Sequence, residues 1–204
     1  FNSLSGSIPT QLGMLTNLIL LSMSHNSLSG KIPSHLGLLS HLHTLSMNDN
    51  SLSGNIPSEL SLLTNLVWLF LYDNSLSGSI PSHMGLLTNL ASLSLLFNSL
   101  TGGIPSQLGL LTKLSFLSLS DNYLLSGNIP SQLGLLSNLR TFWIYNTLLT
   151  GSIPQPFCSL GFSPVIDCDR VECTCCSCIV APSDRPWPSS TPTTRSTRPS
   201  IEAR

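Results

Sequence analysis

The chain repeats itself at a nearly constant interval of 24 residues. The octapeptide NSLSGSIP occupies residues 2–9 and returns unchanged at residues 74–81, three intervals later. A period of this length is typical of solenoids, propellers and repeat arrays, in which each unit buries its apolar face against its neighbours. The interval is read from one proline in each unit, with a single gap of 25 residues: Pro9, Pro33, Pro57, Pro81, Pro105, Pro130 and Pro154.

Apolar residues spaced by three follow each proline. In the unit that begins at Pro33 they are Leu36, Leu39 and Leu42. This spacing places side chains on one side of a short 3₁₀ helix, whereas one face of a strand requires a spacing of two. Ser34 directly follows the proline, and we expect its hydroxyl to cap this helix.

A short strand and a turn complete the unit. Leu45 and Met47 would point to one side of the strand and Ser46 to the other. Gly54 permits a positive φ where the chain reverses. An asparagine follows the strand in five units, and because its amide can bond backbone groups of the turn, stacked copies would form a ladder. These residues are Asn26, Asn50, Asn74, Asn98 and Asn122.

This pattern resembles the plant-type leucine-rich repeat, LxxLxLxxNxLxGxIPxxLGxL. The sequence reads LHTLSMNDNSLSGNIPSELSLL from Leu42 and LASLSLLFNSLTGGIPSQLGLL from Leu90. The resemblance covers residues 1–157 and implies an α/β solenoid: a right-handed curved coil with a parallel β-sheet on its concave face, short 3₁₀ segments and a second small sheet from the LxGxIP portion. Two departures predict irregular turns, namely an extra residue within 122–130 and a missing residue before the asparagine of 142–151.

The scarcity of charge excludes two classes of partner. Only 8% of the residues are charged, the formal net charge is -1, and Lys and Arg form no run. Nucleic acids and anionic membrane surfaces are bound through clustered positive charge, so we expect neither as a partner. The sequence contains no stretch of 18 apolar residues, so we expect no membrane span in this segment, although a membrane anchor could follow residue 204.

The two ends of the array differ. The chain begins inside a repeat, so we expect this to be a fragment that lacks its N-terminal cap and upstream repeats, with Leu4, Ile8, Leu12 and Leu15 exposed at an open end. Residues 181–204 are rich in Pro, Ser, Thr and Arg. That composition predicts a disordered tail or stalk, because it cannot form a core.

All the cysteines lie in residues 158–180, after the last repeat. Such dense thiolates could bind zinc, but the spacings match no common zinc pattern, and an even number beside a solenoid end favours a disulfide-stapled C-terminal cap. Their pairing stays open, and an oxidised cap indicates an extracellular or cell-surface protein. This ending also resembles the caps of diatom and related algal leucine-rich-repeat proteins. The cysteines are Cys158, Cys168, Cys173, Cys175, Cys176 and Cys178.

Function is expected at outward-facing positions of the concave sheet, because the leucines fill the inward ones. On the third strand these positions hold Trp68, Phe70 and Tyr72. Rigid aromatic side chains suit a peptide, protein or glycan ligand, although they could instead shield the sheet or pack on one another. The other candidate ligand-binding residues lie on neighbouring strands or at their ends: Asn48, Asp49, Asp73, Phe97, Phe116, Asp121, Trp143 and Tyr145.

Neither catalysis nor a cofactor is predicted. Asp49 and Asp73 would lie on adjacent strands, but we interpret them as a solvated rim and not as an acid and base pair, because no third catalytic group accompanies them. The histidines form no compact set of three metal ligands, and no serine has an adjacent base. We therefore expect no enzyme activity, no metal site and no cofactor.

Three functions fit the predicted solenoid. The first is a noncatalytic extracellular recognition module, similar to the ectodomains of plant-type leucine-rich-repeat receptors. The second is a secreted inhibitor of a cell-wall-degrading enzyme, similar to polygalacturonase-inhibiting proteins. The third is an ice-binding or other surface-binding protein, since serine and threonine columns would run along the LxGxIP sheet at the strand spacing. The columns are Ser27, Ser51, Ser75 and Ser99, with Ser29, Ser53, Ser77 and Thr101 beside them.

Overall fold

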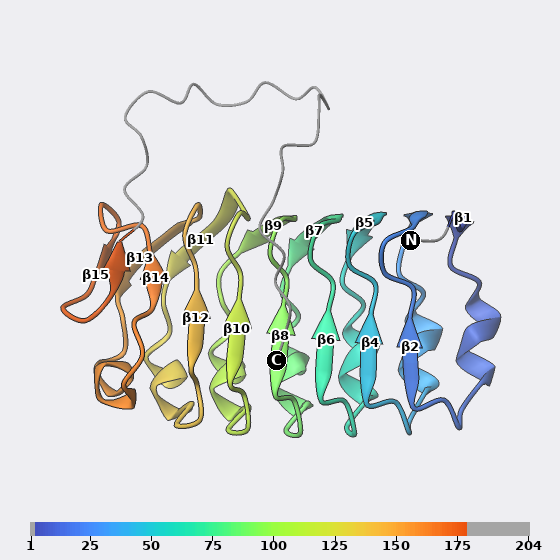
Figure 1. Cartoon of the computed structure of the whole chain (residues 1–204), viewed down its shortest axis with the longest axis horizontal. Helices are drawn as coiled ribbons and strands as arrows, with labels where there is room; N and C mark the ends of the chain where they lie inside the picture. The colour runs from blue at the N-terminus through green and yellow to red at the C-terminus, as the bar shows by residue number, and fades with distance from the viewer. Residues whose placement is uncertain (1–2, 179–204) are drawn as a thin grey trace.

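Two parallel sheets and a row of 3₁₀ helices form a solenoid with one coil per repeat (Figure 1). The computed structural model describes residues 3–178, so the tail predicted for residues 181–204 lies outside the described residues. The strands of each sheet run parallel, and strands of the same sheet come from successive coils. The solenoid predicted from the 24-residue period is therefore confirmed.

The bounds of the elements repeat with the period. The sheet that we call the concave sheet contains β2 (Leu20–Ser22), β4 (Thr44–Ser46), β6 (Trp68–Phe70), β8 (Ser92–Ser94), β10 (Phe116–Ser118), β12 (Thr141–Trp143), β14 (Val165–Ile166) and β16 (Ser177–Cys178). The second sheet contains β1 (Ser5–Ser7), β3 (Ser27–Gly30), β5 (Ser51–Asn55), β7 (Ser75–Ser79), β9 (Ser99–Gly102), β11 (Leu124–Asn128), β13 (Leu148–Ser152) and β15 (Val171–Glu172). The 3₁₀ helices are η1 (Thr10–Met14), η2 (Ser34–Leu38), η3 (Ser58–Leu62), η4 (Ser82–Leu86), η5 (Ser106–Leu110), η6 (Ser131–Leu135) and η7 (Gln155–Leu160).

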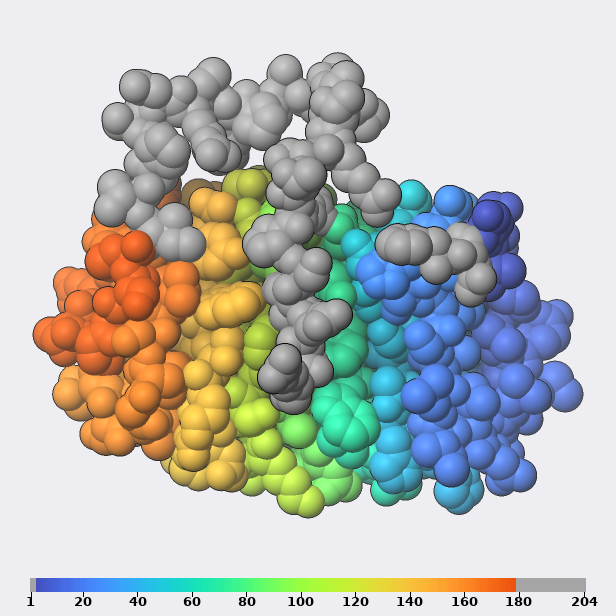
Figure 2. Space-filling view, viewed as in Figure 1, coloured from blue at the N-terminus to red at the C-terminus, as the bar shows by residue number. Residues whose placement is uncertain are grey.

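Stacked leucines fill the space enclosed by each coil. Leu45, Leu69 and Leu93 are register partners on β4, β6 and β8, and none of them has any exposed surface. Burial of each such leucine contributes about 1.5–3 kcal/mol to stability. Figure 2 shows the result from outside, where successive repeats form adjoining bands along the molecule.

The asparagines form the predicted ladder. The Oδ1 atom of Asn98 accepts a hydrogen bond from the backbone N–H of Leu76, 2.9 Å away in the preceding repeat. Its Nδ2 donates to the carbonyl of Leu71 in that repeat, at 3.0 Å, and to Leu95 in its own repeat, at 3.1 Å. The same acceptor geometry recurs at Asn26, Asn50, Asn74 and Asn122. Each amide therefore joins two coils, and at Asn98 and Asn122 it satisfies backbone groups that are buried.

The ladder ends in the sixth repeat, where one sequence expectation is wrong. The segment 142–151 does not lack a residue, because Thr147 occupies the ladder position and Asn146 precedes it in the turn. The Thr147 hydroxyl donates to the carbonyl of Ile144 at 2.8 Å. The Thr147 backbone N–H donates to Asp167 Oδ2 at 3.2 Å, so the C-terminal segment supplies the next acceptor.

The extra residue within 122–130 does produce an irregular turn. The Leu125 N–H donates to the carbonyl of Asn122 at 2.9 Å, which closes a tight turn ahead of the buried Leu125. Tyr123 and Leu124 are about half exposed, at 46% and 53%. The coil thus accommodates the insertion on its outside and keeps both the ladder and the core in place.

Two smaller expectations are also corrected. Ser34 does not cap η2, because Pro33 is the N-cap residue and no side chain bonds the first turn. Ile8 is not exposed at the first coil, since it is 4% accessible and belongs to the core, whereas Leu4 and Leu15 are more than half exposed. Ile8 belongs to the same isoleucine position as Ile32, where the neighbouring coil covers it.

Glycine in the 3₁₀ helices allows neighbouring coils to approach closely. A Cβ atom added at Gly85 would lie 2.5 Å from the backbone oxygen of Gln107 and 2.8 Å from its Cβ. Gly13, Gly37 and Gly109 occupy the same position and face the same obstruction. Ser61 holds the same position in the third repeat and is 5% exposed, so contact between helices favours glycine here without requiring it in every coil. No described helix is long enough to cross a lipid bilayer.

Substitution of Asn98 by alanine should strongly destabilise the solenoid. It removes four hydrogen bonds at a site that is 7% exposed and leaves buried backbone groups unsatisfied, at a cost of about 2–4 kcal/mol. The control is Asn65→Ala, because Asn65 makes a single exposed bond to the carbonyl of Ser40. Chemical denaturation monitored by circular dichroism would measure both, and equal effects would contradict the role of the ladder.

Substitution of Gly85 by alanine should lower the melting temperature. The neighbouring helix would have to move, and overpacking of this kind costs about 2 kcal/mol, or roughly 4–8 °C in a chain of this size. Gly103→Ala is the matched control, because its added Cβ would lie 3.4 Å from the Ser126 oxygen. An unchanged Tm for Gly85→Ala would show that the neighbouring helices leave enough space for a methyl group.

Candidate functional site

The third strand of the concave sheet presents the predicted aromatic residues. Leu69 and Leu71 point into the core with no exposed surface, so the alternate residues Trp68, Phe70 and Tyr72 point outward. Trp68 is 44% exposed, and the other two are half-buried. The rings of Phe70 and Tyr72 meet edge to face with centroids 6.5 Å apart. We call these three residues the first aromatic cluster.

A second aromatic cluster contains Phe116, Trp143 and Tyr145. Phe116 begins β10 and Trp143 ends the adjacent β12, and their rings meet edge to face with centroids 5.6 Å apart. All three are half-buried. The sequence placed Trp143 and Tyr145 on one strand, but only the structure shows that Trp143 contacts Phe116.

Serines separate the two clusters. On the strand register, Ser92 lies between Trp68 and Phe116, so these two aromatic residues are about 10 Å apart at the backbone. In the next row, Ser94 and Ser118 lie between the larger Phe70 and Trp143, and both serines are buried. The predicted aromatic residues therefore lie on two sides of a strip of small polar side chains.

A hydrogen-bonded network covers the first two strands of the concave sheet. Ser24 and Ser46 both donate to Asn48 Oδ1, at 2.6 and 2.8 Å. Asn48 Nδ2 in turn donates to Asp49 Oδ2 at 2.7 Å, and His25 Nδ1 lies 3.3 Å from the same oxygen. Asn48 is 3% exposed. Two predicted site residues, Asn48 and Asp49, are thus already engaged with protein partners.

The column of acidic residues at the strand ends has a backbone origin. Asp49, Asp73 and Asp121 all have φ near +56°, in the left-handed region that Asp, Asn and His tolerate best among residues with a side chain. Phe97 holds the same conformation with a φ of 51°, which is unusual for an aromatic residue. The column therefore reflects turn geometry, since Asp49 and Asp73 are half-buried and Asp121 is buried.

Burial raises the pKa of three groups near the clusters. Asp121 is 4% exposed, and burial raises the pKa of its carboxyl despite hydrogen bonds from Asn146, at 2.7 Å, and Tyr123, at 3.3 Å. Burial also raises the pKa of the Tyr145 hydroxyl, as does the negative charge of Asp121. The pKa of Tyr72 is raised by burial and by Asp49. The tyrosine hydroxyls therefore remain protonated donors well beyond neutral pH.

All six cysteines form disulfides at the C-terminal end. The bonds join Cys158 to Cys175, Cys168 to Cys178 and Cys173 to Cys176. The first bond ties η7 to the segment that follows the repeats. The sulfur atoms of Cys158, Cys173 and Cys175 lie within 4.8 Å of one another, but in these disulfides they offer no thiolate to a metal. The segment also extends the concave sheet with β14 and β16 and the second sheet with β15.

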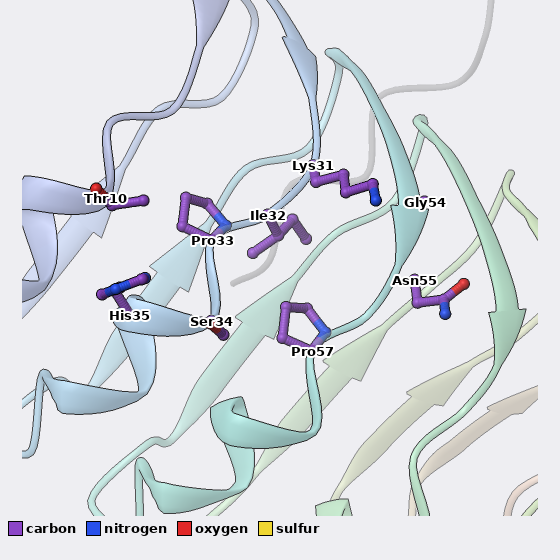
Figure 3. A pocket seen from close by; sticks show the side chains of 9 residues that line it. All are labelled: Thr10, Lys31, Ile32, Pro33, Ser34, His35, Gly54, Asn55 and Pro57. Atoms are coloured by element: carbon purple, nitrogen blue, oxygen red, sulfur yellow. The ribbon is translucent and has the colours of Figure 1, made fainter.

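A shallow hollow lies away from the aromatic clusters, where the second sheet meets the 3₁₀ helices (Figure 3). Its volume is about 450 Å³, and the sequence did not single it out. Lys31 and His35 are its only basic side chains, and they project from different parts of the wall. The lining residues are Thr10, Lys31, Ile32, Pro33, Ser34, His35, Gly54, Asn55 and Pro57.

The stacked 24-residue coils, the leucine core and the asparagine ladder define a leucine-rich-repeat protein. The Leucine Rich Repeat family model matches residues 17–39, 41–63, 65–87, 113–136 and 138–160, and the chain belongs to this family. None of the curated proteins matches the chain.

Several solved receptor structures are similar to this chain. The TDR receptor is 39% identical with a TM-score of 0.77, over 81% of this chain and 29% of that one. The plant peptide hormone receptor RGFR1, in complex with RGF2, is 37% identical with a TM-score of 0.75, over 80% and 27%. The Arabidopsis receptor kinase HAESA, in complex with the peptide hormone IDA and the co-receptor SERK1, is 36% identical with a TM-score of 0.75, over 83% and 29%. This chain therefore spans less than a third of each of these chains.

Proposed function

We propose that the chain is a noncatalytic extracellular recognition module that binds an extended peptide or protein segment on its concave sheet. The observation that carries the proposal is Trp68, which remains 44% exposed on a sheet whose core positions are already filled. A large aromatic side chain exposed in this way is the usual anchor of a binding surface. Similarity to receptors solved with peptide hormones supports the choice of a peptide.

The arrangement of the clusters suits a ligand that contacts several strands. An extended peptide can place apolar side chains against the first cluster, at Trp68, and the second, at Phe116, while its backbone passes over Ser92 between them. The protonated hydroxyls of Tyr72 and Tyr145 would donate to its carbonyl groups. A glycan could use the same aromatic surfaces, and it is tested as an alternative ligand below.

The contacts of the serines support a noncatalytic role. A nucleophilic serine needs a base within hydrogen-bond distance. Ser24 and Ser46 instead donate to the amide oxygen of Asn48, and His25 lies against Asp49. The disulfides of the C-terminal segment support an extracellular location, because such bonds persist in oxidising compartments.

Two other functions would use this scaffold differently. An inhibitor of a cell-wall-degrading enzyme would bind its target on the same concave sheet. A surface-binding protein would use the second sheet, where Ser27, Ser51, Ser75 and Ser99 are exposed and regularly spaced. Thermal hysteresis of a concentrated solution would identify an ice binder, and unaltered ice growth would remove that candidate.

Replacement of Trp68, Phe70 and Tyr72 by alanine should weaken ligand binding at least about a hundredfold, since buried aromatic anchors contribute about 2 kcal/mol or more each. The assay would select ligands from a random peptide library and a glycan array with the full chain, and then compare affinities by calorimetry. Leu124→Ala is the control, because Leu124 is 53% exposed on the second sheet. Unchanged affinity in the triple variant, or selection of glycans alone, would overturn the proposal.

A further inference from the structure

An exposed apolar row runs along the 3₁₀ helices, on a different part of each coil from the concave sheet. The last residue of each of the first six helices is large and apolar, and these residues are between 52% and 76% exposed. Neighbouring helices pack against each other, so the side chains form one continuous row. We call this row the leucine stripe; it consists of Met14, Leu38, Leu62, Leu86, Leu110 and Leu135.

The core does not explain the leucine stripe. In η2 and directly after it, the inward positions are taken by Leu36 and Leu39, which have no exposed surface, while Leu38 between them is 55% exposed. The repeat pattern IPxxLGxL leaves the position of Leu38 unspecified, yet every one of the six helices carries leucine or methionine there. The largest contiguous apolar patch on a soluble protein is often functional, so we expect another molecule to cover the stripe.

The area of the stripe fits a protein interface. With about half of each side chain exposed, six residues present on the order of 400 Å² of apolar surface. A standard interface buries about 800 Å² on each partner, of which somewhat more than half is apolar. The stripe with its polar borders therefore supplies about the area and composition that one side of a stable dimer requires.

The borders of the stripe are nearly free of charge. Three positions before each stripe residue the sequence has Gln11, His35, Glu59, His83, Gln107 and Gln132, and three positions after it has Asn17, His41, Asn65, Asn89, Lys113 and Asn138. Glu59 and Lys113 are the sole formal charges among these residues at pH 7 with histidine neutral. A strongly charged partner could form few ion pairs with these residues, whereas a second copy of the chain presents the same nearly neutral, apolar surface.

We propose that the leucine stripe is a homodimer interface in which two copies pack antiparallel about a twofold axis between Leu62 and Leu86. Because the row has the same spacing in both copies, the side chains of one can interdigitate with those of the other along the whole row. The axis places Leu62 of one copy against Leu86 of the other. It also sets Glu59 opposite His83, so that no two like charges meet at the centre.

The dimer adds a property that recognition alone does not require. The stripe lies on the helices, so pairing leaves the concave sheet of each copy uncovered. The assembly would then carry two recognition surfaces, and a ligand with two copies of a motif would bind with increased avidity.

Sedimentation velocity on the full chain tests this proposal. Between about 1 and 100 μM, the range typical of a modest interface, we expect a concentration-dependent species of twice the 21.9 kDa chain mass. The double variant Leu62→Asn, Leu86→Asn should raise the dimer dissociation constant at least about tenfold, because it replaces the four apolar side chains that form the two central contacts. The control is Leu124→Asn, which removes an equally exposed leucine outside the stripe and should leave the constant unchanged.

Three results would overturn the dimer. The first is a chain that stays monomeric up to the highest concentration, and the second is a dimer that Leu124→Asn weakens as much as the central double variant does. The third is a monomer that binds neutral phosphatidylcholine vesicles through the stripe. If the central double variant loses its native circular dichroism, Leu38→Asn with Leu110→Asn tests the same row. Peptide selection on the dimer-deficient variant keeps this result distinct from a failure of the recognition function.

Discussion

The hydrogen bonds of the asparagine ladder are the constraint on which the rest of the structure depends. Each coil turns sharply after its concave strand, and the turn leaves backbone groups that neither sheet can satisfy. Asn98 accepts from the N–H of Leu76 and donates to the carbonyls of Leu71 and Leu95, so one side chain serves two coils. Because the amide needs both coils at fixed positions, it sets the spacing at which the leucines stack.

Once the ladder and the core are fixed, the outward positions of the concave sheet are free to differ between repeats. Trp68, Ser92 and Phe116 occupy equivalent positions on successive strands, yet they differ greatly in size and polarity. Their backbones keep the same register because none of these side chains takes part in the ladder or in the core. The scaffold and the recognition surface are therefore specified by different residues of the same 24-residue unit.

Much of this structure could be predicted from the sequence, because the same residue pattern occurs in each repeat. The period, the inward leucines and the ladder of Asn50 and its copies follow from spacing alone. Contacts that occur once could not be predicted in this way. The pairing of Phe116 with Trp143 depends on the relative register of two particular strands, and the burial of Asn48 depends on neighbouring serines. The ladder position of Thr147 is hidden in the sequence because an asparagine stands next to it without occupying it.

The turn between Asn122 and Leu125 shows where a coil can change its length. The additional residue there is displaced outward, with Tyr123 and Leu124 half exposed, while Asn122 and Leu125 on either side stay fully buried. A coil is fixed in place at its ladder residue and at the next core leucine. The chain between these two residues can therefore accommodate an inserted residue. At this turn the chain is longer by one residue, while the strands on either side keep the register of the other repeats.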